Sequence, residues 1–424
     1  MSRPSTPPDS LRKAAWIFLA AFALLGFSRD WAMVTRTGSI DFRNRVTGAR
    51  LLVAGEDAYH YKWLPGAPEG WCDVYANRAH PVTKTTVTPA MLLLTGPVAA
   101  LPYPLAQRFW LLLQWACLTG IWWLWFQPLT SSGTRLLWTF LIVAFSWTLA
   151  WRHHVDRGQY YILLTLILSC WITRSRSATA SHALLTGAMA GLLAALRPPL
   201  LLLVAPFIWW RRPAQRQGLA LGCAVAFLLP WLGNGDSWGQ YGRAMGEWSR
   251  IYRHDENPAP GPLAYPPVIE GLGLDHLSRY AVRQYADSSL FRLARALGLP
   301  AVPAPLVLAI LLLLLGLWWR AAGSRGDAVV LTGIAGWSFL IDFFLPAYRN
   351  PYNDTLIPGT LACLLAFAPA SRIPLILTAC GLGTGWILSV WEPPALWLIH
   401  LPTLFFIALA CRAVVPTAAP PHTQ

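Results

Sequence analysis

The sequence predicts an all-α, polytopic transmembrane protein with about twelve membrane segments. Two observations indicate this class. The 424-residue chain is 55% hydrophobic and only 12% charged, whereas a soluble domain usually carries about 25% charged residues. Apolar runs of about 20 residues, which cross roughly 30 Å of hydrocarbon as a helix, recur along nearly the whole chain. These observations exclude a water-soluble fold.

Twelve apolar segments are candidates for membrane crossings, and an even number places both termini on the same side. The candidates are 14–34, 105–126, 136–151, 158–173, 183–196, 198–210, 217–233, 301–319, 328–345, 354–370, 373–391 and 395–411. We expect a transmembrane catalytic core over 1–370, a C-terminal transmembrane hairpin over 371–413 and a disordered tail over 414–424.

The first crossing is followed by GSIDFRNRVTGARLLVAGEDAYHY (38–61). Apolar residues recur at helical spacing from Phe42 to Val53, which predicts an amphipathic interfacial helix in the first outer loop. Asp41 stands at its start, among several arginines. Two compatible interpretations stay open: Asp41 or Ser39 is the N-cap of this helix, or Asp41 is a catalytic carboxylate that the helix dipole and the arginines keep ionised.

The next apolar stretch, TPAMLLLTGPVAALPYP (88–104), is short and is interrupted at Pro97, Pro102 and Pro104. If it crossed the membrane, every later connection would change sides. We therefore expect a helix that lies on the outer face or dips into it, with a crossing as the alternative.

The segment WRHHVDRGQYY (151–161) contains two adjacent histidines, His153 and His154, which suggest a metal site. Adjacent histidines point apart on a helix, and no further ligand has a suitable spacing, so we predict no metal. Arg152 and Arg157 are better suited to binding a phosphate, with the histidines as neutral donors or as a boundary cap. The alternative is that these arginines extend to the lipid interface.

Segments 183–196 and 198–210 are only 13–14 residues long, or about 20 Å of helix. The turn LRPP (196–199) between them is therefore expected below the outer surface. Arg197 would then face a cavity, because an unpaired charge near the bilayer centre costs ~2.5–3.5 kcal/mol or more. We expect Arg197 to share the phosphate with the arginines of the preceding segment.

The late connection PAYRNPYND (346–354) is either a polar turn or part of a sugar pocket. Tyr348, Arg349 and Asn350 supply hydroxyl, guanidinium and amide donors. This connection is predicted on the same side as GEWSRIYRHDE (246–256) and the three earlier polar stretches. We expect these separated stretches to converge on one site.

The Lys and Arg residues of the short connections fall on one predicted side, which has almost no acids and is therefore cytoplasmic. Loops 35–104 and 234–300 then lie outside. The net charge of +14 does not indicate a nucleic-acid partner, because no basic cluster is interleaved with aromatics in a soluble segment. Six of the seven cysteines lie in apolar runs, so no disulfide is expected.

Five stretches of the chain carry a family resemblance. These are the acid-led helix ending in GARLLVAGEDAYHY, then TPAMLLLTGPVAALPYPLAQRFW, RGQYYILLTLIL, GAMAGLLAALRPPLLLLVAPFIWWRR and PAYRNPYNDTLIP. They resemble the C-type (GT-C) integral-membrane glycosyltransferases, most of all glycosyltransferase family 87, the polyprenyl-phosphate-mannose-dependent mannosyltransferases. The counterparts are the first outer loop, the Pro-bearing interfacial helix, the Gly-Gln stretch, the glycine-rich hairpin and the late polar loop. The resemblance covers roughly residues 14–370.

Several features depart from the family pattern, including an unusual insertion at 62–86. Arg197 stands where the hairpin usually has Lys, and Tyr160 and Tyr161 stand where an Asn often follows. The late loop lacks the expected His and offers Arg349 and Asn350 instead. These differences bear on the sugar and on the phosphate contacts more than on the fold.

The resemblance implies a GT-C-like fold that moves a hexose, mannose first, from a polyprenyl-phosphate-sugar donor to a hydroxyl of a lipid or glycan. It implies a site on the outer face of the bacterial inner membrane, in contact with membrane lipids, and no cofactor. Asp41 would be the catalytic base of an inverting, metal-independent transfer. The residues expected to bind substrate are Arg43, Arg152, His153, His154, Arg157, Gln159, Arg197, Tyr348, Arg349 and Asn350.

Two other classes stay open from the residues alone. One is a lipid or solute transporter or flippase, although transporters often show paired discontinuous segments in corresponding halves and only one short hairpin (183–210) is evident. The other is a non-catalytic membrane scaffold.

Overall fold

The computed structural model describes residues 9–367, except for 38, 62, 64–65, 73–84, 178–179, 255–297, 301–302, 324–325, 347–348 and 350. These described residues form helices and turns, with no β-strand among them, which confirms the all-α class. The α-helices are α1 (Asp9–Thr37), α2 (Ile40–Val53), α3 (Pro89–Ala99), α4 (Tyr103–Phe126), α5 (Ser132–Phe145), α6 (Leu149–Arg157), α7 (Tyr161–Ser177), α8 (Ala180–Leu196), α9 (Leu201–Arg211), α10 (Arg216–Gly233), α11 (Ser237–His254), α14 (Ala304–Ala322), α15 (Asp327–Phe344) and α16 (Ile357–Phe367). The 3₁₀ helices are η1 (Glu69–Trp71), η2 (Pro198–Leu200), η3 (Pro213–Gln215) and η5 (Pro351–Leu356).

Four helical segments in the described part of the chain are long and apolar enough to cross a membrane. They are α1, α4, the η3–α10 segment and α14, and the bent pair α5–α6 is a fifth if it counts as one span. The other predicted crossings up to residue 367 are also helical, although the count of twelve is not confirmed. The predicted crossings 373–391 and 395–411, and the tail 414–424, lie outside the described residues.

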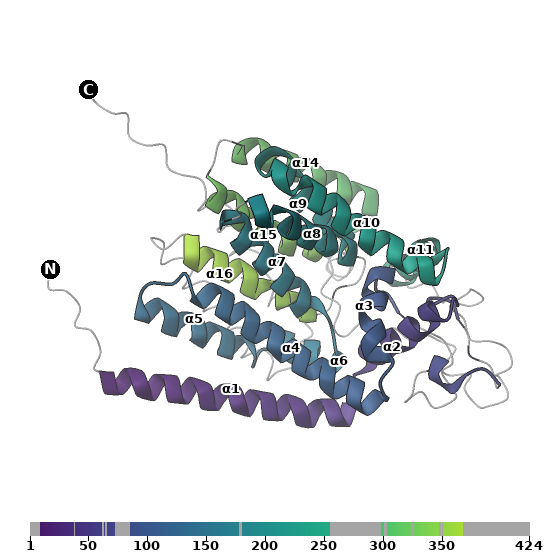
Figure 1. The fold of residues 1–424 in the computed structure, drawn as a ribbon, viewed down its shortest axis with the longest axis horizontal. Helices are drawn as coiled ribbons and strands as arrows, with labels where there is room; N and C mark the ends of the chain where they lie inside the picture. The colour runs from purple at the N-terminus through teal and green to yellow at the C-terminus, as the bar shows by residue number, and fades with distance from the viewer. Residues whose placement is uncertain are drawn as a thin grey trace.

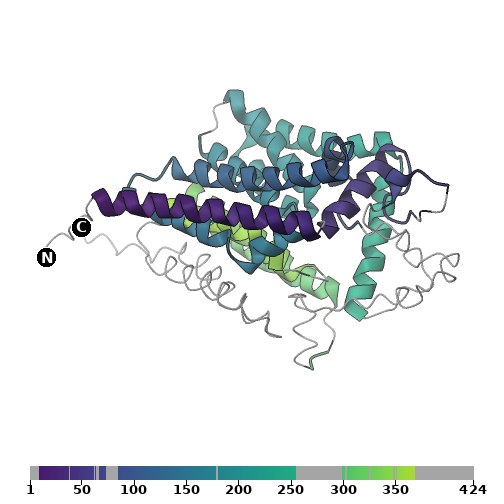
Figure 2. The ribbon, with the colours of Figure 1, turned by 90° about the horizontal axis from the view of Figure 1, so that it is seen from below.

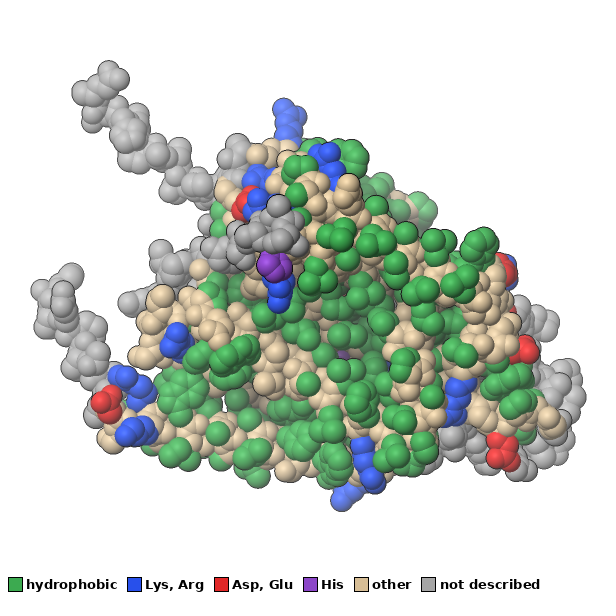
Figure 3. All heavy atoms as spheres, viewed as in Figure 1, with side chains coloured by type: hydrophobic (Ala, Val, Ile, Leu, Met, Phe, Trp, Pro, Cys, Tyr) green, Lys and Arg blue, Asp and Glu red, His purple; other side chains and the backbone are tan. Residues whose placement is uncertain are grey.

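The outward faces of the long helices carry the residues that a lipid-facing surface requires. Leu24 and Leu25 of α1, Leu232 of α10 and Leu313 of α14 are exposed. Figure 3 shows hydrophobic side chains over most of one face of the molecule, with few charges among them. Such extensive exposed apolar surface indicates a membrane environment.

Helices α2 and α3 lie between the first span and α4 in the chain. The apolar face of α2 is buried from Phe42 to Leu52, and α2 packs against α3, whereas Val53 is exposed. Helix α3 has 11 residues, about 16 Å of helix and half of the hydrocarbon thickness. Its length favours the prediction that residues 88–104 do not cross. Figures 1 and 2 show α2, α3 and α11 gathered at the end of the molecule opposite the start of α1.

The predicted crossing 136–151 is not one straight helix. Helix α5 ends at Phe145, α6 begins at Leu149, and the two are bent by 54°. The Arg29 guanidinium donates to the Ser146 carbonyl at 2.8 Å, and the Thr148 hydroxyl caps α6 by accepting from the Trp151 N–H at 3.3 Å. The break therefore has its own hydrogen bonds, and it turns α6 toward α2.

Asp30, which the sequence places inside the first crossing, joins three helices. Its buried carboxylate accepts from Arg29 of α1, from the Trp115 Nε1 of α4 at 3.1 Å and from the Trp151 Nε1 of α6 at 2.7 Å. A buried carboxylate is tolerated when it is paired and hydrogen-bonded. Asp30 therefore fixes α6 relative to the first span.

Helices α8 and α10 approach more closely than side chains would allow. A Cβ added at Gly187 would collide with the Gln215 carbonyl, and one at Gly218 with the Leu184 carbonyl. Small residues permit this backbone contact in membrane helix pairs. The pair carries Arg197 at the end of α8, in the turn before η2.

The end of α9 lies beside the start of α15. Arg211 and Arg212 both form ion pairs with Asp327 at the start of α15. The connections after α9 and before α15 therefore lie at the same end of the bundle, as their positive charges predicted.

Candidate active site

Asp41 is the second residue of α2, so it is not the N-cap. Ser39 occupies that position with a left-handed backbone (φ 49°), and its side chain makes no capping hydrogen bond. The capping interpretation is therefore wrong for Asp41, whereas Ser39 has the predicted N-cap position without a capping side chain. A carboxylate in the first turn of a helix is still favoured by the helix dipole, so the position of Asp41 suits an ionised group.

The Asp41 carboxylate contacts two residues at the end of α6. Its Oδ2 accepts a hydrogen bond from the Gln159 side-chain amide. Its Oδ1 lies 3.7 Å from the Arg157 guanidinium. The Asp41 and Arg157 side chains are 27% and 44% exposed, so one edge of this carboxylate is open to a substrate.

Gly158 places Gln159 against α2. Helix α6 ends there because Gly158 has a left-handed conformation (φ 66°), and a Cβ at this position would lie 2.6 Å from the Phe42 Cβ. The Gly158 carbonyl accepts from the Trp110 Nε1 at 2.8 Å and from the Arg45 guanidinium. Glycine is required here both by its conformation and by the close approach of α2.

Arg45 is a site residue that the sequence analysis did not select. It is buried, and its Nη1 donates to the Gln159 Oε1 at 3.1 Å. Arg45 stands four positions after Asp41, which puts both on one face of α2. That spacing was a signal for Arg45, whereas Arg43 is not among the main charges that act on Asp41.

Burial and the nearby arginines shift the pKa of Asp41 in opposite directions, and the net shift is upward. Burial raises the pKa of Asp41 above its usual range, and Asp156 adds to the rise. The Arg157 and Arg45 guanidiniums and the Gln159 amide all lower this pKa by stabilising the ionised form. Such a carboxylate is more basic than one in water and still has the partners of an anion.

Arg197 has a protein partner, so it is not the unpaired charge that the sequence suggested. It forms an ion pair with Asp342 of α15, and Asn353 of η5 donates to the other Asp342 oxygen at 2.7 Å. The Arg197 and Asp342 side chains are 24% and 3% exposed. Nothing local in the sequence links Asp342 or Asn353 to Arg197, so neither was among the predicted site residues.

Tyrosines connect the Asp41 cluster with the Arg197 cluster. The Arg45 guanidinium lies 5.6 Å from the Tyr160 ring centroid, and that of Arg197 lies 5.5 Å from the Tyr161 centroid. From α11, Tyr241 approaches within 5.7 Å of the Tyr59 ring. Burial, with Tyr160 nearby, raises the pKa of Tyr241 to about 12, so its hydroxyl stays protonated at neutral pH.

His154 has a structural role rather than the predicted contact with substrate. It is fully buried, and its Nε2 accepts from the Ile162 N–H at 3.2 Å, which fixes the start of α7. Of its neighbours on α6, His153 is half-buried and Arg152 is exposed. In the described part of the chain, no three His, Cys, Asp or Glu side chains form a group that could hold a metal ion.

Arg349 of the late loop is buried within the protein, although the sequence predicted that it binds substrate. Arg349 is completely buried, forms an ion pair with Asp354 and lies 5.2 Å from the Phe339 ring centroid. It therefore holds the loop onto α15 instead of facing a sugar. Tyr348 and Asn350 lie outside the described residues.

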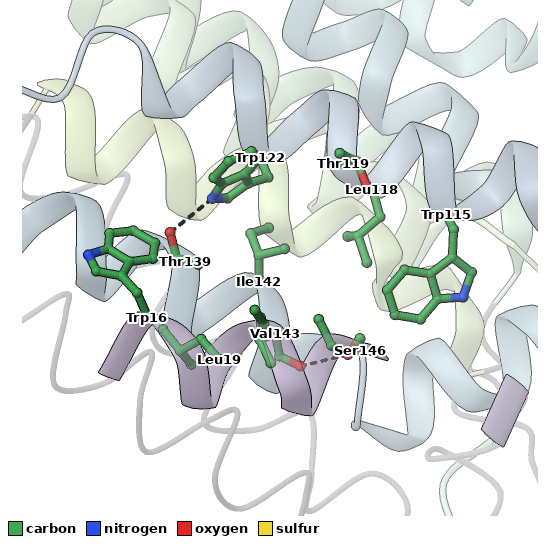
Figure 4. Close-up of a pocket in the computed structure, with 12 residues that line it drawn as sticks. Trp16, Leu19, Trp115, Leu118, Thr119, Trp122, Thr139, Ile142, Val143 and Ser146 are labelled. Atoms are coloured by element: carbon green, nitrogen blue, oxygen red, sulfur yellow. Dashed lines mark hydrogen bonds between the residues drawn. The ribbon is translucent and has the colours of Figure 1, made fainter. Parts of the chain in front are cut away.

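An apolar cavity of about 320 Å³ lies away from these clusters, between α1, α4 and α5. Figure 4 shows that its walls are aliphatic and aromatic, with a few hydroxyls. Thr139 accepts from the Trp122 Nε1 at 2.9 Å, and Ser146 donates to the Val143 carbonyl at 2.7 Å. None of the predicted site residues lines it, and its surface fits hydrocarbon rather than a sugar.

Comparison with known proteins gives one match. The family model described as glycosyltransferase family 87 matches residues 86–345. No curated protein and no solved structure matches the chain. The matched range includes Gln159, Arg197 and Asp342, whereas Asp41 precedes it.

Proposed function

This chain belongs to glycosyltransferase family 87, and on that premise we propose that it transfers mannose from a polyprenyl-phosphate donor to a hydroxyl of a lipid or glycan acceptor. The chain is a membrane glycosyltransferase. The observation that supports the proposed reaction best is the Asp41 carboxylate, which is partly exposed and hydrogen-bonded through one oxygen only in the described contacts.

In the proposed reaction, Asp41 is the general base. The acceptor hydroxyl gives its proton to Asp41 while its oxygen forms a bond to the anomeric carbon. The bond between that carbon and the phosphate oxygen breaks, and its electron pair leaves with the polyprenyl phosphate. General-base catalysis of this kind contributes ~10²–10⁴-fold in rate. A single displacement inverts the anomeric configuration.

The arginines are suited to the leaving phosphate. Arg157 is nearly half exposed beside the base, so it can approach a phosphate without leaving the site. Guanidinium–phosphate hydrogen bonds are about twice as strong as neutral ones, and they oppose the charge that develops on the leaving group. Arg197, which is 24% exposed, takes part in this role by keeping its pair with Asp342 and donating its remaining N–H groups to the phosphate.

The tyrosines between the clusters are suited to the sugar. Tyr241 of α11 is partly exposed and has a protonated hydroxyl close to Arg197, with the buried Tyr160 beside it. An aromatic face contacts the apolar C–H face of a hexose, and a hydroxyl can donate to or accept from the sugar. Mannose in this position would lie between the base and the phosphate-binding arginine.

The test is product analysis with the purified protein in lipid nanodiscs. Polyprenyl-phosphate donors that carry labelled mannose or glucose are supplied with lipid and glycan acceptors, and Asp41→Asn is the control. We expect transfer from the mannose donor, inversion at the anomeric carbon by NMR, and the same rate with a chelator present. Transfer from a nucleotide sugar but from no polyprenyl donor would overturn the proposed donor.

We also propose that the Asp41 end faces the periplasm or cell exterior of a bacterial inner membrane. Arg243 on α11 is exposed near this end, and Arg216 lies at the opposite end of α10. In a Cys72→Ser background, an impermeant thiol reagent added to whole cells should label Arg243→Cys and not Arg216→Cys. The reverse pattern would place the site in the cytoplasm.

A further inference from the structure

Gln159 lies between two charged groups of opposite sign. Its Oε1 faces the Arg45 guanidinium at 3.1 Å, and its Nε2 faces the Asp41 carboxylate. A guanidinium can only donate hydrogen bonds, whereas an ionised carboxylate can only accept them. The amide therefore has one favourable orientation, since a flipped amide would oppose its NH₂ to Arg45 and its oxygen to Asp41.

The backbone of Gln159 is held independently of its side chain. The Gln159 carbonyl accepts from the Gln114 Nε2 at 2.8 Å, and the preceding Gly158 carbonyl accepts from Trp110 and Arg45. Arg45 thus binds both the backbone at 158 and the side-chain amide at 159. The position and the orientation of the amide are both determined before a substrate arrives.

We propose that Gln159 is a positioning residue that occupies the Asp41 Oδ2, so that the Asp41 Oδ1 is the atom that receives the acceptor proton. Oδ1 is the oxygen on the side of Arg157, which is the more exposed of the two partners. The proton transfer in this inference rests on the proposed function. The contact between Gln159 and Asp41 is observed in the structure and does not depend on that function. Gln159 is therefore assigned to orienting the base rather than to binding the donor.

The charge state of Asp41 provides a readout for this role. The groups that act on Asp41 are Arg157 and Asp156 of α6, Arg45 of α2, and Gln159 itself. The Gln159 amide stabilises the ionised carboxylate, so its loss should raise the pKa of Asp41. A residue that only packs against Asp41 would not change this pKa in a defined direction.

The experiment measures protonation of Asp41 without any sugar transfer. A carbodiimide modifies the protonated carboxyl, so the modification of Asp41 is followed by peptide mass spectrometry across a pH series. Gln159→Leu removes the donor, and the pH midpoint should move upward by about one unit. Gln159→Glu keeps the size of the side chain and adds a second carboxylate, so it should move the midpoint further.

Gln114→Leu is the matched control, because it removes a buried amide that contacts the Gln159 backbone and His154 but not Asp41. Its midpoint should move by much less than that of Gln159→Leu, because Trp110 and Arg45 still hold the neighbouring Gly158 carbonyl. A midpoint that stays in place in both Gln159 variants would overturn the inference. If Gln159→Leu does not fold, Gln159→Glu alone decides, because it has nearly the shape of the native residue.

Sugar transfer by the same proteins separates the two proposals. In the Gln159 variants, kcat should fall about tenfold or more, while the donor KM stays unchanged. A raised donor KM with an unchanged kcat would return Gln159 to substrate binding. If the unchanged protein transfers no sugar while the midpoints move as expected, the proposed function fails and the positioning role of Gln159 stands.

Discussion

Asp41 and Asp342 have the same kinds of partners and different surroundings. Asp41 contacts an arginine and a primary amide, Arg157 and Gln159, and Asp342 contacts Arg197 and Asn353. The Asp41 side chain is 27% exposed and lies 3.7 Å from a half-exposed guanidinium. Asp342 is 3% exposed and directly bonded to its arginine.

The difference shows how one arrangement can serve two purposes. A buried, fully bonded carboxylate is difficult to protonate and difficult to move, because breaking its pair leaves an unpaired charge in a poor solvent. An open carboxylate with one loosely placed cation can exchange a proton with a substrate. This difference supports the proposal that catalysis takes place at the Asp41 cluster and that Asp342 holds Arg197.

The largest expected effect comes from removing the charge of Asp41. Asp41→Asn should lower sugar transfer by ~10²–10⁴-fold, because an amide cannot accept the acceptor proton. Its unfolding free energy should change by no more than about 1 kcal/mol, the size of the charge–dipole interaction. Turnover and thermal unfolding in detergent measure the two effects, and near-normal transfer would give Asp41 a structural role.

Removing the carboxylate of the Arg197 cluster should lower the stability of the fold more than it affects catalysis. Asp342→Ala leaves Arg197 without its partner and should cost about 3–5 kcal/mol of stability. The double variant Asp342→Ala with Arg197→Met should recover most of that loss, because no charge then stays unpaired. Denaturant unfolding measures both variants. An equally unstable double variant would show that the pair is not the cause.

A smaller effect on stability is expected at Gly158, where α6 ends against α2. Gly158→Ala places a side chain at a left-handed position, which costs about 1–2 kcal/mol, and also forces α6 away from Phe42. The midpoint temperature of thermal unfolding should fall. Turnover should fall more than in the control variant Gly246→Ala, because Gly246 has open space around it. Equal losses in both variants would contradict the close contact between α2 and α6.

The smallest effect on stability is expected at Arg157. Its ion pair with Asp41 is half exposed, so Arg157→Gln should change stability by less than about 1 kcal/mol. Arg157 lowers the pKa of Asp41, so its removal raises that pKa. Because the base must be ionised, the pH at which turnover falls on the acid side should move upward. A pH–rate profile that does not move would separate Arg157 from the base.

The sequence predicted what depends on local pattern. Hydropathy gave the membrane class and the positions of most helices, and helical periodicity gave α2 within one residue of its observed start. The family resemblance led to the family that the match confirms. These signals are contained in windows of about 10–20 residues, which is why they can be read without a structure.

The sequence could not supply contacts between distant segments. Arg197 and Asp342 are 145 positions apart, so Arg197 looked like an unpaired cation that needed a ligand. The break between α5 and α6 depends on Arg29 of another helix, and the flanking apolar residues gave no sign of it. Asp30 likewise lies inside the predicted crossing 14–34, and nothing near it in the sequence indicates its partners Trp115 and Trp151.

The glycine contact between α8 and α10 has a mechanical consequence. Two backbones in contact cannot slide by small amounts, and tightly packed helices shift by steps of about one turn, ~5.4 Å. Arg197 at the end of α8 is therefore held by a rigid helix pair and moves only when α8 and α10 move together. Under the proposed function, any motion that admits a donor must therefore come from elements outside the α8–α10 pair.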